Sequence, residues 1–257
     1  MAHDPLRQNA GVSFDAIDID SIDAVNWSAI PNPTGHTCDD PQRVAHALRL
    51  LTASTTANET GDAASLLAGG GFVCGHAAMV FPAAHPATPI LLDLVEHGRR
   101  PRVRDAALGL LSDALCFSPL AGLNRVDTAY GRDVPLCCAI ARHIRTHRRT
   151  ALLAHGRSGR RLLAEAELHW RLTIEETELR PDGGTTAIVA LEGAPFRTPA
   201  EAELHTPPFA QPVLPVHVAA LTADASGAAL IQLGRTPPGT VVPGSTLHPA
   251  ECGLREH

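Results

Sequence analysis

The 257-residue sequence contains no lysine, so all 21 of its basic residues are arginine. It is also poor in aromatic side chains, at 4%, with two tryptophans and one tyrosine. The hydrophobic fraction of 44% is still enough to form a core, which excludes a disordered chain. That core must be filled mainly by leucine, alanine and valine. We attribute the missing lysine to a GC-rich genome rather than to selection for phosphate binding.

Several functional signals are also missing. No stretch reaches the roughly 18 apolar residues that span a bilayer. Residues 1–30 are acidic and lack the basic and apolar regions of a secretory signal. The sequence has no Gly-x-Ser-x-Gly motif, phosphate loop or dinucleotide fingerprint. These absences predict a cytoplasmic protein with no membrane partner, and they give no support to the enzyme classes that carry those motifs.

Helical patterns dominate residues 41–171. Asp40 and Pro41 are a capping carboxylate and a first-position proline, and Val44, Leu48 and Leu51 follow at helical spacing. Similar short helices, separated by polar turns, continue to about residue 171. Paired helices of this length are typical of helical repeats, with an ordinary helical bundle as the alternative. Residues 1–40 are expected to form an acidic segment that caps the first helices.

The pattern changes to strands at residues 172–235. Segments 172–179 and 185–191 flank a turn at 181–184, and a second such unit follows at 216–221 and 228–233. We expect a small antiparallel β domain of about four strands made from two hairpins. The remaining residues, 236–257, are rich in proline and glycine and are expected to form a loose tail.

Five segments carry a resemblance to a known family: residues 23–30, 39–41, 76–83, 89–94 and 130–135. Together they resemble a bacterial HEAT-repeat family over about residues 20–170. The resemblance implies an N-terminal HEAT-like α-solenoid of antiparallel helix pairs, followed by the small antiparallel β-hairpin domain, so the fold class is α+β. The motifs are structural and imply no catalytic residues. Some HEAT-like bacterial proteins are immunity or adaptor proteins, and others bind DNA.

Charge is unevenly placed along the chain. Residues 97–171 contain 14 arginines and six acidic residues, a net charge of +8, whereas the remainder carries −14. The arginines gather at expected helix ends, where they could line one edge of a solenoid or simply be solvated. The candidate partner-binding residues are Arg99, Arg100, Arg102, Arg104, Arg142, Arg145, Arg148, Arg149, Arg157, Arg160 and Arg161.

The cysteines show no regular framework, so buried free thiols are expected rather than disulfides. Two groups of potential metal ligands occur: Cys74 with His76 and His85, and His248 with Glu251, Cys252 and His257. Neither group has the spacing of a closed zinc site. Cys137 and Cys138 lie on an apolar helix face and are expected to be core residues. We therefore expect no metal, no cofactor and no catalytic residue.

The sequence favours a non-enzymatic protein–protein interaction module, of adaptor or immunity type, that binds an acidic partner through an arginine-rimmed helical surface. The first alternative is a nucleic-acid-binding protein, which the acidic remainder of the chain disfavours. The second is an enzyme of unrecognised type with a site between the helices and the β domain.

Overall fold

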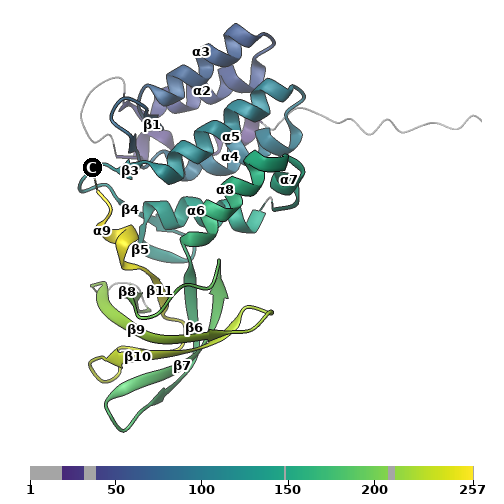
Figure 1. The fold of residues 1–257 in the computed structure, drawn as a ribbon. Helices are drawn as coiled ribbons and strands as arrows, with labels where there is room; N and C mark the ends of the chain where they lie inside the picture. Colours follow the sequence, from purple (N-terminus) through teal and green to yellow (C-terminus); the bar gives the residue numbers. More distant parts are fainter. Residues whose placement is uncertain (1–18, 32–38, 148, 208–211, 257) are drawn as a thin grey trace, which may run out of the picture.

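The computed structural model describes residues 19–31, 39–147, 149–207 and 212–256. Helices occupy most of the described chain up to residue 168, and the long strands follow. Figure 1 shows these as two stacked parts, with a short C-terminal helix beside their junction. After this helix, Arg255 and Glu256 lie against the helical part, where they bond to the end of α5 and to Gly122.

The helical segments are mostly short, and several have clear local causes. Asp40 caps the second helix by accepting a hydrogen bond from the Gln42 backbone N–H at 2.9 Å, and Pro41 fills its first position. The segments are α1 (Ile19–Asp23), the 3-10 turn η1 (Trp27–Ala29), α2 (Pro41–Ala53), α3 (Ala57–Ala68), α4 (Ala84–His97), α5 (Pro101–Cys116), α6 (Leu136–His147), α7 (Arg149–Ala154), α8 (Gly156–Leu168) and α9 (Ala250–Leu254).

One hydrophobic core extends through the helical part, from Ile22 to Ala166. Helix α4 contacts α1, α2, α5, α6 and α7, and its buried residues occupy most of its circumference. Trp27 is buried as well, and its indole N–H donates to the Ile22 carbonyl at 2.8 Å. The N-terminal segment thereby packs on α2 and α4.

Two small sheets interrupt the helices: β1 (Val73–Cys74), β2 (Met79–Val80) and β3 (Ser118–Pro119) form one, and the hairpin of β4 (Arg125–Thr128) and β5 (Gly131–Pro135) forms the other. A HEAT-like solenoid stacks similar helix pairs, each of which packs only on its neighbours. Here helices of 5 to 16 residues, interleaved with strands, share one core. The prediction of a HEAT-like α-solenoid of helical repeats is therefore wrong.

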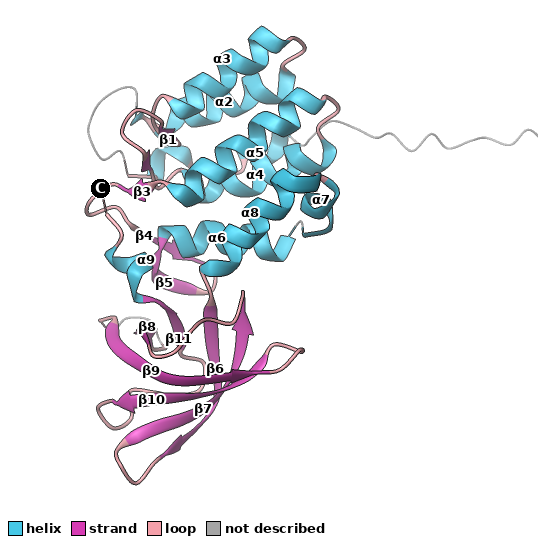
Figure 2. Ribbon diagram, viewed as in Figure 1, coloured by secondary structure: helices cyan, strands magenta, loops and turns pink. Residues whose placement is uncertain are grey.

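The C-terminal part is a closed antiparallel barrel. Its strands are β6 (Arg171–Leu179), β7 (Gly184–Glu192), β8 (Ala200–His205), β9 (Leu214–Ala223), β10 (Ala228–Arg235) and β11 (Thr246–Pro249). The strands follow the order β10-β7-β6-β11-β8-β9 around the barrel, and Figure 2 shows them gathered away from most of the helices. Alternate side chains, such as Ile174, Val189, Val218 and Ile231, point inward and are buried. The barrel interior is therefore a packed core.

The prediction of a small β-hairpin domain with a loose tail is also wrong. The two expected hairpins are present as β6–β7 and β9–β10, joined through β7 and β10. However, β8 and β11 pair with each other and close the sheet. Residues 236–257 supply β11 and α9, so this stretch is part of the fold. The helices in the described part of the chain include none that is long and apolar enough to cross a membrane.

A partly buried histidine pair joins α4 to α6 and gives a pH prediction. The Nε2 atoms of His85 and His143 are 3.2 Å apart, and burial lowers the pKa of His85 to about 4. Because the unfolded chain binds this proton more tightly, stability should fall as the pH drops from about 6.5 to 4, by up to about 3 kcal/mol. We expect His85→Gln to reduce the difference between urea unfolding free energies measured at pH 7 and pH 4.5.

The matched control is His46→Gln, because His46 is exposed on α2. That variant should keep the full wild-type difference between the two pH values. An unchanged pH dependence in His85→Gln would show that the His85 imidazole does not contribute in this way.

Candidate metal centre

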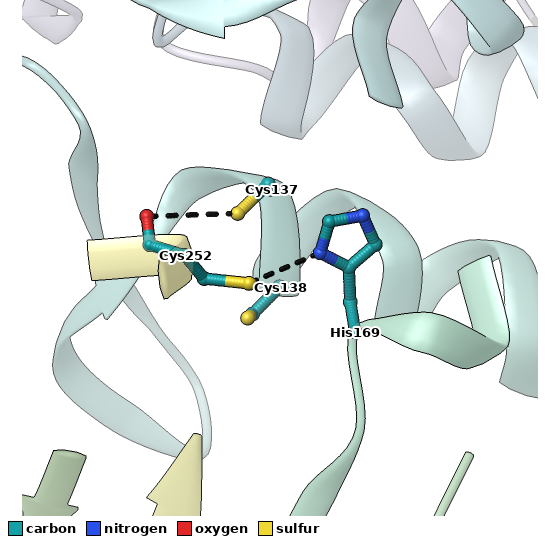
Figure 3. Close-up of side chains that lie close together, drawn as sticks. All are labelled: Cys137, Cys138, His169 and Cys252. Carbon is teal, nitrogen blue, oxygen red and sulfur yellow. Dashed lines mark hydrogen bonds between the residues drawn. The ribbon is translucent and has the colours of Figure 1, made fainter. Parts of the chain in front are cut away.

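Four potential metal ligands meet at the junction between the helices and the barrel. Cys137 and Cys138 lie in α6, His169 lies between α8 and β6, and Cys252 lies in α9. One ligand atom from each lies within 4.8 Å of all the others. Figure 3 shows the three sulfur atoms and the imidazole ring gathered from these separate segments.

The group is compact and largely shielded from solvent. Cys137, Cys138 and Cys252 are 0%, 2% and 2% exposed, and His169 is partly buried. The Nδ1 atom of His169 lies 3.1 Å from the Cys252 sulfur, and the Cys137 sulfur lies 3.8 Å from the Cys252 carbonyl oxygen. The nitrogen that would coordinate a metal therefore already faces the sulfur atoms.

Local structure explains how each ligand reaches this point. Strand β5 ends at Pro135 and α6 begins at once, which places both adjacent cysteines in the first turn of the helix. The α6 start is fixed by the Leu136 N–H, which donates to the Asn124 carbonyl at 2.7 Å. The amide of Asn124 also donates to the Gly253 carbonyl at 2.7 Å, and so holds α9 beside α6. Backbone N–H groups at a helix start favour thiolate over thiol.

The thiols influence one another strongly. The pKa of the Cys137 thiol lies well below its usual range because Cys138 and Cys252 hydrogen-bond to its sulfur. Burial raises the pKa of Cys138 well above its usual range, and the bond to Cys137 raises that of Cys252. This arrangement favours a thiolate at Cys137 that accepts hydrogen bonds from the thiols of Cys138 and Cys252. A divalent cation would compensate the repulsion and allow all three to ionise.

Three arginines surround one carboxylate beside this group. Glu192 accepts hydrogen bonds from Arg142 Nε at 2.9 Å and from Arg171 Nη1 at 2.8 Å. The same two guanidinium groups lie over the Tyr130 ring, 4.1 and 5.1 Å from its centroid. Arg145 is buried and donates to backbone carbonyl groups. This junction therefore carries more positive than negative charge, and an anionic partner would balance it.

The donor set matches zinc chemistry. Zinc binds thiolate sulfur at about 2.3 Å and imidazole nitrogen at about 2.0–2.1 Å in a tetrahedron, so its sulfur ligands lie roughly 3.8 Å apart. The four ligand atoms all lie within 4.8 Å of one another, so small side-chain rotations are enough to complete such a site. Three thiolates, one neutral imidazole and Zn²⁺ give a net charge of −1, which complements the excess of arginine. A second group, Asp93, Glu96 and His97, is partly or fully exposed and lacks sulfur ligands.

The structure distributes the predicted partner-binding arginines over different environments. Arg142 and Arg145 bond to other groups of the chain at the junction, Arg142 being partly exposed and Arg145 buried, and Arg148 lies outside the described residues. Arg100 and Arg104 are partly buried. Those with exposed side chains are Arg99, Arg102, Arg149, Arg157, Arg160 and Arg161.

The sequence-based interpretation of the cysteines was incomplete. No disulfide links the five described cysteines, in agreement with the expectation of free thiols. However, Cys137 and Cys138 are potential ligands as well as core residues, and Cys252 joins them without His248 or Glu251. His257 lies outside the described residues. Because the ligands come from three separated segments, only the adjacent Cys137–Cys138 pair gave a local signal.

Comparison with known proteins does not identify a family. No family model matches the chain, and no curated protein matches it. A structural search finds a flavohemoglobin from Malassezia yamatoensis with bound FAD and heme, at 11% identity and a TM-score of 0.20. The match covers 80% of this chain and 58% of the flavohemoglobin, so this chain spans less than two thirds of that protein. A score this low supports no statement about fold or function, and the site must be interpreted from its own chemistry.

Proposed function

We propose that the protein binds one zinc ion through Cys137, Cys138, His169 and Cys252, and that the ion fastens the barrel to the helical part. The observation that carries this proposal is the meeting of four ligand atoms from α6, α9 and the α8–β6 connection. Thiolate and imidazole are ligands that zinc prefers, and an oxygen-seeking cation such as Mg²⁺ would not select them.

A structural role is favoured over a catalytic one. Catalytic zinc sites usually have three protein ligands and keep one position open for water or substrate, whereas structural sites are closed by four. Here all four ligands come from the protein, and the three sulfur ligands are buried. A substrate would have no free coordination position. The expected cytoplasmic location would also keep these thiols reduced and able to bind metal.

The positions of the ligands in the chain suggest what the ion does. His169 precedes the first barrel strand, β6, and Cys252 follows the last, β11. Both would be tied to the two cysteines of α6. A metal ion at this point would therefore clamp the two ends of the barrel segment to the same helix, and closing such a loop stabilises the folded state.

Metal content tests the proposal directly. Protein produced in zinc-supplemented medium and dialysed against metal-free buffer should retain about one zinc per chain by elemental analysis. Cys138→Ser should lose most of it, whereas Cys116→Ser should keep it, because Cys116 is exposed on α5 and outside the ligand group. Metal-free wild type, or equal zinc in both variants, would remove the proposal.

A second candidate function is binding of an acidic protein at an arginine-rich edge of the helical part. The His155 imidazole Nε2 lies 2.8 Å from the Val95 carbonyl oxygen, so the α7–α8 turn lies beside the end of α4. Arg157 is the second residue of α8, Arg99 lies in the turn after α4 and Arg102 lies in the first turn of α5. The contact therefore brings the starts of α8 and α5 to the same end of the helical part. Exposed arginines at these two helix starts would then line one edge, which supports an interaction surface for negative charge.

A labelled polyglutamate peptide is a suitable probe of this second function. The peptide should bind the wild type at low ionic strength, and its binding should weaken as salt is raised. It should not bind a triple variant that carries Arg157→Glu, Arg160→Glu and Arg161→Glu. Arg197→Glu, at an exposed position of the barrel part, is the control for a charge reversal away from this edge, to be compared with Arg157→Glu alone. Equal binding to the wild type and the triple variant would rule out this edge.

A further inference from the structure

Arg145 is a buried cation that bonds to the segment carrying one of the candidate ligands. Its side chain is only 9% exposed. One guanidinium nitrogen, Nη1, donates to the carbonyl oxygen of Ala166 at 2.7 Å and to that of His169 at 2.6 Å. Burying a charged side chain is costly unless it is paired or hydrogen-bonded, so a specific role is expected at this position.

The two acceptors are carbonyl groups at the C-terminal end of α8. His169 is the residue that ends this helix, with φ −85° and ψ 60°, and its own N–H donates to Ala166 at 3.3 Å. The last carbonyls of a helix have no partner within the helix, and a guanidinium can satisfy them. Arg145 therefore fixes the backbone from which the His169 imidazole extends towards Cys252.

Helix α6 connects this contact to the sulfur ligands. Arg145 lies seven residues after Cys138, which is two helical turns, so both side chains lie on the same side of α6. Long helical side chains point back towards the helix N-terminus, which brings the guanidinium group towards the cysteines. The positive charge therefore lies on the side where an anionic zinc–thiolate complex would form.

We propose that Arg145 is a positioning residue of the metal centre: it holds His169 in place as the nitrogen ligand. This inference rests on the proposed function, because it concerns the same site. The chain is already ordered on the other side of His169, since the neighbouring Trp170 ring stacks on Phe196 with centroids 3.9 Å apart. Arg145, from α6, supplies the matching constraint on the α8 side of His169 by binding the Ala166 and His169 carbonyl groups, so the imidazole is held between two fixed points.

A double-mutant cycle tests the inference. Zinc affinity is measured by competition with a chromophoric chelator for the wild type, Arg145→Met, His169→Ala and the double variant. Loss of a residue that supports a ligand typically weakens metal binding by about 10- to 100-fold, and we expect this for Arg145→Met. In the His169→Ala background the same change should have an effect of less than about two-fold, because Arg145 acts through His169.

The ligand-field spectrum of bound Co²⁺ gives a second readout. It should change in Arg145→Met in the same direction as in His169→Ala, because the first variant misplaces the nitrogen ligand and the second removes it, whereas Arg149→Met should keep the wild-type spectrum. Arg149 is exposed and lies just after α6. If Arg145→Met does not fold, Arg145→Lys takes its place in the cycle, since it keeps the charge but loses the paired carbonyl contacts.

The outcomes separate the two proposals. A wild type that binds neither zinc nor Co²⁺ overturns the proposed function, and this inference with it. A wild type that binds zinc normally, while Arg145→Met weakens binding equally in both backgrounds or not at all, overturns only the role of Arg145. Loss of affinity confined to the background that retains His169 is the result that supports it.

Discussion

Replacing Cys252 by serine is expected to loosen the end of the barrel and to lower thermal stability substantially. Cys252 would hold α9, and through it strand β11, against α6. Releasing this ligand reopens a loop of roughly 80 residues, and loop-closure arguments for cross-links put the loss at about 4 kcal/mol. For a chain of this size that corresponds to roughly 10 °C in Tm. Removing the metal from the wild type with a strong chelator should have the same effect.

Differential scanning calorimetry and limited proteolysis measure this effect together. The chelator-treated wild type and Cys252→Ser should melt at similar temperatures, and new cleavage should appear near residues 236–257. Cys116→Ser is the matched control, because it removes an exposed thiol outside the site. If the chelator leaves the melting temperature of the wild type unchanged, the metal does not fasten the barrel.

Among the substitutions compared at neutral pH, replacing Glu192 by glutamine is expected to have the second largest effect on the free energy of unfolding. The Glu192 carboxylate accepts from both Arg142 and Arg171, and Arg145 lies close by. Without its charge, positive groups face one another at a partly buried junction. Removing one partner of a fully buried ion pair costs about 3–5 kcal/mol. Since the Glu192 side chain is 29% exposed, we expect a smaller loss of about 2 kcal/mol.

The pH dependence provides an internal check on the Glu192 prediction. Burial raises the pKa of Glu192, but the hydrogen bond and charge of Arg142 and the charge of Arg171 outweigh it, so the net pKa is lowered. A lowered folded-state pKa gives stability that is present above about pH 4.5 and is lost as the pH falls further. Unfolding in urea from pH 7 to pH 3 should therefore show a smaller acid loss for Glu192→Gln than for the wild type.

Glu201→Gln is the control for this experiment. Glu201 is exposed on β8 and bonds to the exposed His217 at 2.8 Å, so its replacement should change stability by less than about 0.5 kcal/mol. If the two variants lose similar free energies of unfolding, the positive charge of the junction arginines does not depend on Glu192 for neutralisation.

The elements that could be predicted from the sequence are those whose cause is local. The start of α2 follows from Asp40 and Pro41, which act within one helical turn. The hairpin turns follow from aspartates that accept nearby backbone N–H groups: Asp182 from Gly184 at 2.9 Å and Asp224 from Ser226 at 2.7 Å. These interactions involve neighbours in the sequence, so composition and spacing are enough to reveal them.

The closure of the barrel depends on distant contacts. Strand β8 carries Glu201, Glu203 and His205, whose charge hides its strand character. Glu203 is nevertheless buried, because Arg125 of the helical part binds its carboxylate with two hydrogen bonds of 3.0 and 2.7 Å. Strand β11 has only four residues within a proline- and glycine-rich stretch. Neither strand could be recognised without its partners.

The arginine prediction shows the same limit. Arg142 and Arg145 have the same local pattern as the exposed arginines, since all lie in basic stretches of the sequence. Their junction partners come from distant segments: Arg142 binds Glu192 of the barrel and Arg145 binds the carbonyl groups of Ala166 and His169. Likewise, Cys137 and Cys138 fit an apolar helix face, and nothing in their own segment indicates that His169 and Cys252 lie beside them. The metal centre is a property of the tertiary fold.

X-ray absorption at the zinc edge of the purified, zinc-loaded protein tests the central claim most directly. We expect a first coordination sphere of three sulfur atoms at about 2.3 Å and one nitrogen at about 2.0–2.1 Å. His169→Ala should replace the nitrogen by a light solvent atom, and Cys252→Ser should reduce the sulfur count to two. A zinc ion surrounded only by nitrogen and oxygen, or a protein that takes up no zinc, would contradict the account.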